Sequence, residues 1–110
     1  MRSLSDETLE QVADRFKVLA EPTRLRILRA LGEEEKTVGA LVEELDSSQA
    51  NVSKHLGILR RHRMVTRRKE GTNRVYRVAD DSIFRLCELV CGRLEEEVRE
   101  RRRALGADDG

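Results

Sequence analysis

The sequence predicts a small, mainly helical domain that carries one β-hairpin. Apolar residues recur every three or four positions through most of the 110 residues, as in amphipathic helices. The period changes to two only between residues 64 and 78, as in paired strands. A chain of this length forms one domain with a modest core. We place this domain at residues 1–105 and expect residues 106–110 to form a disordered tail.

Four helices are predicted before the hairpin. The second helix stops at Gly32, and the acidic run 33–35 that follows reads as a solvated turn. A turn at residues 46–48 joins the short third helix to the fourth, which is the spacing of a helix-turn-helix. In that arrangement the second helix is presented to DNA. The predicted caps or first residues of the four helices are Ser5 or Thr8, Pro22, Thr37, and Ser47 or Ser48.

The fourth helix has an unusual outward face. Val52, Leu56 and Leu59 share its inward face, by their spacing. The opposite face is polar but made mostly of small residues, and Gly57 costs the helix about 1 kcal/mol relative to alanine. Short side chains suit a helix that lies close against another molecule, such as the groove of DNA. A half-buried helix in a small helical core is the alternative. The outward residues are Ala50, Ser53, Lys54 and Gly57, flanked by Asn51.

The hairpin is predicted from strands at residues 64–69 and 74–78, with Gly71 and Asn73 supplying the turn. Its basic tip could reach phosphates or a minor groove once the hairpin packs on the helices. A long last helix is expected from residues 80–82 to about Arg103, with acids first and arginines last, as the helix dipole favours.

The positive charge of the chain is concentrated in one segment. The net charge is only +1, yet residues 47–77 hold nine basic side chains and one acidic one. The segments on either side are both net negative. A basic stretch of this kind, coinciding with the helix-turn-helix and hairpin, indicates a polyanionic partner.

Other classes of protein fit the sequence poorly. It has no apolar run of membrane-spanning length and few aromatic residues for stacking single-stranded bases. We find no Ser-His-Asp grouping, phosphate loop or cluster of metal ligands, so we do not expect an enzyme. The two cysteines fit neither a zinc ribbon nor a disulfide framework, which predicts a cytoplasmic protein.

Four short blocks resemble the ArsR/SmtB family of winged-helix repressors. They are LAEPTRLRIL at 19–28, SQANVSKHLGIL at 48–59, RKEG at 68–71 and VYR at 75–77. The resemblance implies a homodimer, formed through the first and last helices, that leaves operator DNA when an inducer binds or oxidation occurs. Together with the outward face and basic hairpin, it leads us to expect DNA contacts from Ser48, Gln49, Ala50, Asn51, Ser53, Lys54, His55, Arg67, Arg68, Lys69 and Arg74.

Two familiar metal sites of that family have no counterpart here. Arsenite- and cadmium-sensing members carry a run of cysteines on the third helix. At those positions this chain has TVGALV, residues 37–42, which contains no cysteine. The Asp-x-His motif of zinc-sensing members is replaced by Asp81 and Ile83. His55 and His62 are the only histidines, and both fall in the DNA-reading region, which makes zinc a poor candidate. For His55, a structural hydrogen bond is at least as good an interpretation as a base contact.

Cys87 and Cys91 are the remaining candidates for a sensor. They are four apart on the last helix and therefore share a side of it. As small hydrophobes they could simply pack in a dimer interface. Alternatively, their thiols could bind a soft metal or arsenic, or undergo oxidation or persulfidation. We expect a dimeric repressor of double-stranded operator DNA; a winged-helix module that binds protein instead is the alternative.

Overall fold

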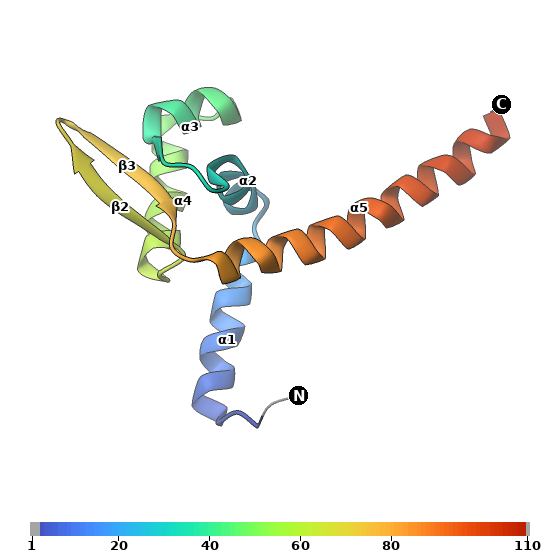
Figure 1. The fold of residues 1–110 in the computed structure, drawn as a ribbon, viewed down its shortest axis with the longest axis horizontal. Coiled ribbons are helices and arrows are strands. Elements are labelled where there is room, and N and C mark those ends of the chain that lie inside the picture. The colour runs from blue at the N-terminus through green and yellow to red at the C-terminus, as the bar shows by residue number, and fades with distance from the viewer. Residues whose placement is uncertain (1–2, 110) are drawn as a thin grey trace. The chain divides into compact units, whose positions relative to one another are not determined.

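The structure is a computed structural model that describes the backbone of residues 3–109, while the side chains of Phe84, Cys87 and residues 107–109 lie outside the description. The chain divides into two compact units, one ending at Asp80 and one formed by the last helix (Figure 1). Its elements in order are α1 (Asp6–Leu19), α2 (Pro22–Leu31), β1 (Lys36–Thr37), α3 (Val38–Leu45), α4 (Gln49–Arg61), β2 (Val65–Glu70), β3 (Asn73–Val78) and α5 (Asp81–Asp109).

The helix starts follow the predicted caps. The side-chain oxygens of Ser5, Thr37 and Ser48 each accept a hydrogen bond, at 3.1 Å, from the backbone N–H three residues later. Each bond satisfies one of the N–H groups that a helix start leaves without a partner. Of the two serines before α4, Ser48 is thus the cap. Pro22 opens α2, and Gly32 ends it with a positive φ of 52°, which favours glycine.

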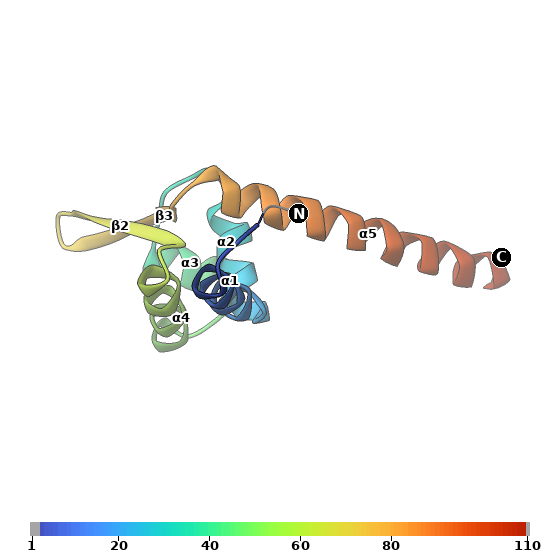
Figure 2. The same ribbon diagram turned by 90° about the horizontal axis from the view of Figure 1, so that it is seen from below.

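The predicted hairpin is part of a three-stranded antiparallel sheet in the order β1-β3-β2. The two-residue strand β1 was not predicted, because two residues carry no periodic signal. Strands β2 and β3 with their turn, residues 65–78, form the wing, which extends beyond α3 and α4 in Figure 2. Gly71 makes the turn at a φ of 62°.

The core of the first unit lies among α2, α3, α4 and the sheet. The prediction for the inward face of α4 is confirmed, because Val52, Leu56 and Leu59 have no exposed surface. This anchorage fixes the opposite face of α4 at the surface. The buried apolar residues are Val18, Ile27, Leu28, Leu31, Leu41, Val52, Leu56, Leu59, Met64, Val65, Val75, Tyr76 and Val78.

Helices α1 and α5 each expose an apolar stripe. Leu9, Val12 and Phe16 of α1 are between 36% and 53% exposed at helical spacing. On α5 the stripe contains Val90, Leu94 and Val98. Helix α5 continues past the predicted end near Arg103 and overlaps the expected tail at 106–110 as far as Asp109. Among the described helices, none is both long and apolar enough to span a membrane.

Candidate nucleic-acid interface

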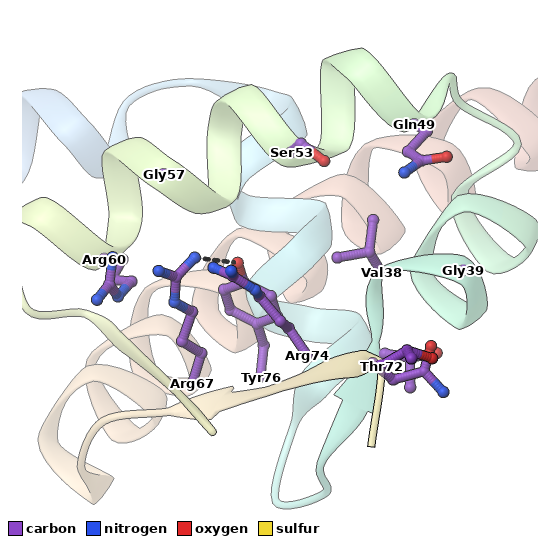
Figure 3. A pocket seen from close by; sticks show the side chains of 12 residues that line it. Val38, Gly39, Gln49, Ser53, Gly57, Arg60, Arg67, Thr72, Arg74 and Tyr76 are labelled. Atoms are coloured by element: carbon purple, nitrogen blue, oxygen red, sulfur yellow. Dashed lines mark hydrogen bonds between the residues drawn. The ribbon is translucent and has the colours of Figure 1, made fainter. Parts of the chain in front are cut away.

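A groove of about 570 Å³ separates the exposed face of α4 from the wing (Figure 3). The start of α3 closes one end of it. Three arginines line the groove, and none of its lining residues is acidic, so it favours an anion. The lining residues are Thr37, Val38, Gly39, Gln49, Ser53, Gly57, Arg60, Arg67, Thr72, Asn73, Arg74 and Tyr76.

Helix α4 contributes one continuous face to the groove. Gln49, Ser53, Gly57 and Arg60 follow one another at intervals of four, four and three residues, which places them on the same side of a helix. A Cβ atom built on Gly57 meets nothing within 4 Å, so packing within the chain does not require glycine there. The absence of a side chain instead keeps the groove open beside the helix axis.

The wing contributes side chains from alternate positions. Because strand residues alternate between faces, Arg67 of β2 and Tyr76 of β3, which are paired in register, share the face toward α4. The Arg67 Nη1 atom donates a hydrogen bond of 3.5 Å to the Tyr76 hydroxyl. In Figure 3, Arg67 and Arg74 extend from the wing toward α4. Two wing guanidinium groups therefore face the helix that carries Gln49 and Ser53.

Arg68 lies on the opposite face of the wing and is held by carboxylates. Its Nη2 and Nε atoms donate to Glu35 Oε2 at 2.6 and 3.1 Å, and Nη2 lies 3.0 Å from Glu70 Oε2. The hydrogen bond from Arg68 holds the pKa of Glu35 below its ordinary value, and the same bond raises the pKa of Arg68. Residues 33–35 are exposed and lie outside the helices and strands, as predicted, and Glu35 is in addition the ion-pair partner of Arg68.

The predicted contact residues of α4 differ in exposure. Ser48, Gln49, Ala50, Ser53 and Lys54 are exposed. Asn51 is half-buried, and its Nδ2 atom donates to Ser47 Oγ at 3.0 Å.

His55 is buried, with 7% of its surface exposed. Its Nδ1 atom lies 3.7 Å from Glu21 Oε2. Burial argues against a base contact from His55, but the structure shows no hydrogen bond at Nδ1, so the predicted structural hydrogen bond stays a prediction.

Arg60 and Tyr76 line the groove and were not among the predicted contacts. The spacing 49, 53, 57, 60 could have identified Arg60, since it continues the face that begins at Gln49. Tyr76 could have been found only with the strand register, which the sequence pattern did not define. Lys69 is exposed and pairs in register with Arg74 at the tip of the wing.

The two cysteines lie on α5, outside the groove. Cys91 is exposed and takes part in no disulfide, while the side chain of Cys87 lies outside the described residues. Among the described residues, no group of three or more His, Cys, Asp or Glu side chains could hold a metal ion.

Comparisons with known proteins agree with this geometry. The helix-turn-helix domain family matches residues 19–68. An HTH-type transcriptional regulator of Methanocaldococcus jannaschii, MJ1325, is 39% identical over 85 residues, which are 76% of this chain and 96% of the relative. A transcriptional repressor SmtB homolog of Synechocystis is 37% identical over 84% of this chain and 70% of its own.

A solution structure of a homodimeric winged helix-turn-helix DNA-binding domain from Mycobacterium bovis superposes with a TM-score of 0.79. It is 33% identical, and the match covers 91% of this chain and 95% of that one. It is described as a possible ArsR-family transcriptional regulator. With its anchored fourth helix, basic groove and wing, the chain belongs to the ArsR/SmtB family of winged helix-turn-helix transcriptional repressors.

Proposed function

We propose that this protein is a homodimeric repressor that holds operator DNA between α4 and the wing of each protomer. The observation that carries this proposal is the groove itself, which combines three arginines with a small-residue helix face and contains no acidic lining residue. It acts by binding alone, without catalysis, in the compartment that contains its operator DNA.

In the proposed complex, α4 enters the major groove, which is wide enough to admit a helix. Gln49, at the exposed N-terminal end of α4, can form paired hydrogen bonds with an adenine edge. Arg67 and Arg74 of the wing contact phosphates, which fix the orientation of the protein on the duplex. Ser53 and Gly57 allow the close approach that this arrangement needs.

The first test is selection of a duplex from fragmented genomic DNA by the purified protein. We expect one class of fragment to be enriched and to bind at least about 10³-fold more tightly than a scrambled duplex at physiological salt. Equal binding to all duplexes would limit the protein to non-specific association. A folded dimer that binds no duplex at low salt would refute the proposal and favour a protein-binding winged-helix module.

The two neighbouring wing arginines should differ in their effect on the salt dependence of binding. Each phosphate contact contributes about −0.9 to the slope of log affinity against log salt. Arg67→Ala should reduce the magnitude of that slope by about 0.9, because Arg67 faces the groove. Arg68→Ala should change it much less, because Glu35 and Glu70 already neutralise Arg68. Equal slope changes in the two variants would show that Arg68 also contacts phosphate.

The cysteines of α5 support regulation by an inducer that reacts with thiols. Cys91 is exposed, and Cys87 lies one helical turn away in sequence. Soft metals, arsenic and oxidants react with thiolates, and a coupling of about 1–3 kcal/mol would lower operator affinity about 5- to 150-fold. The switch would act through the dimer, since two recognition helices must meet the duplex about one helical turn apart.

The corresponding experiment measures operator release by arsenite, cadmium, peroxide and sulfane sulfur. We expect at least one reagent to release the wild type and to leave a Cys87→Ser, Cys91→Ser double variant bound. If the double variant responds as the wild type does, the cysteines are packing residues and the sensor lies elsewhere.

A further inference from the structure

The N-terminus of α2 and the recognition helix α4 meet at a cluster of charged and polar side chains. Glu21, the N-cap of α2, accepts a hydrogen bond of 3.0 Å from the backbone N–H of Arg24 through its Oε2 atom. The Nε atom of Arg24 lies 3.8 Å from the same oxygen, and Nδ1 of His55 lies 3.7 Å from it. One carboxylate oxygen therefore faces two side-chain nitrogens from two helices.

Both nitrogens are buried without a hydrogen-bond partner in the structure. A buried polar atom in this state costs free energy, which a small movement toward Glu21 would recover. The His55 side chain is 9% exposed and Glu21 is 31% exposed, so water competes little for the His55 nitrogen. Burial acts to raise the pKa of Glu21, but the Arg24 N–H bond and the charges of His55 and Arg24 hold that pKa below its ordinary value.

We infer that Glu21 and His55 form a brace that sets the position of α4 against α2, so that His55 is a positioning residue for DNA binding and does not touch DNA. The other buried side chains of α4, those of Val52, Leu56 and Leu59, are apolar, and apolar contacts are not directional. A small shift that let Nδ1–H of His55 donate to Glu21 across the present 3.7 Å would add a directional contact halfway along α4, between the exposed residues Ser53 and Gly57. The inference rests on the proposed operator binding.

The experiment compares operator affinity for Glu21→Gln, His55→Leu and their double variant, all as full-length dimers. We expect each single substitution to lower affinity about 10-fold, the scale of one hydrogen bond to a charged group. The double variant should be no weaker than the weaker single variant, because both substitutions break the same contact. If the two single losses of affinity multiply in the double variant, Glu21 and His55 act independently, and the inference is wrong.

The sign of the Glu21→Gln effect separates positioning from simple electrostatics. Removing a negative charge from a DNA-binding protein should by itself increase affinity, whereas loss of the brace decreases it. Glu43→Gln is the matched control, since Glu43 is exposed on α3 and the substitution removes the same charge. Unchanged or increased affinity for Glu21→Gln, beside a similar result for Glu43→Gln, would also overturn the inference.

His55→Asn guards against a purely structural explanation. The asparagine amide can donate from about the position of Nδ1 but fills less of the core, so it should restore most of the affinity that His55→Leu loses while lowering the unfolding midpoint in urea. If operator affinity instead falls in step with the urea midpoint across the variants, and His55→Asn recovers none of it, His55 contributes only to the stability of the core. If the wild type itself fails to bind any duplex, the proposed function fails, which is a different result.

Discussion

Replacing Gly57 by glutamate should weaken operator binding by roughly 30-fold or more and leave the protein folded. The Cβ position of Gly57 is open, and glutamate has a better helix propensity than glycine, so the free protein should gain up to about 1 kcal/mol in stability. In the complex, the new carboxylate would lie between α4 and the DNA without a partner. An unpaired charge at an interface costs about 2–5 kcal/mol, which is a loss of roughly 30-fold or more.

Gly57→Ala is the control for this variant. It raises helix propensity in the same way but adds only a methyl group, so operator affinity should stay within a few-fold of the wild type. The two readouts are the urea midpoint and the operator affinity. If Gly57→Glu binds as the wild type does, α4 does not face DNA at this position, and the proposed orientation of the recognition helix is wrong.

A charge at Leu94 should convert the dimer to monomer and remove most operator affinity. Leu94 is 50% exposed at the middle of the α5 stripe, and a second copy would bury it. A glutamate would have to be buried unpaired in that interface, which strongly disfavours association. A monomer engages only one half-site, and losing the linkage between two sites costs on the order of 10²–10⁴-fold in affinity.

Leu89→Glu provides the matched control on the same helix. Leu89 is 74% exposed, and its position in sequence places it away from the stripe of Val90, Leu94 and Val98. This variant should stay dimeric by light scattering and keep its affinity. A wild type that is monomeric at micromolar concentration, or a Leu94→Glu variant that remains dimeric, would contradict the assignment of α5 to the interface.

The sequence was most informative where a local signal decides the structure. Capping serines and threonines satisfy their own helix start, so Thr37 was identified from the sequence, and Ser5 and Ser48 were each one of two predicted candidates. The inward face of α4 followed from spacing alone. The end of α5 was predicted too early, because no glycine or proline lies between Gly92 and Gly106 to mark it.

The site was less predictable because it depends on partners that are distant in sequence. Four basic residues of the wing, Arg67, Arg68, Lys69 and Arg74, were expected to contact DNA. Strand alternation instead turns Arg68 away, and Glu35, 33 residues earlier, binds it. The contact between His55 and Glu21 could not be predicted either, because Glu21 caps α2 and is distant in sequence from His55 in α4. Strand alternation alone could have predicted that Arg67 and Arg68 lie on opposite faces of the wing. The acidic partners of Arg68 and His55 could be identified only from the tertiary structure.

The most direct test of the central claim is an NMR titration of ¹⁵N-labelled protein with its selected operator duplex. We expect the largest changes in backbone amide shifts at residues that line the groove, namely Gln49, Ser53, Gly57, Arg67 and Arg74, and smaller changes on the opposite face of the wing at Arg68. Changes concentrated instead on the exposed stripe of α1, with the groove residues unaffected, would contradict the account.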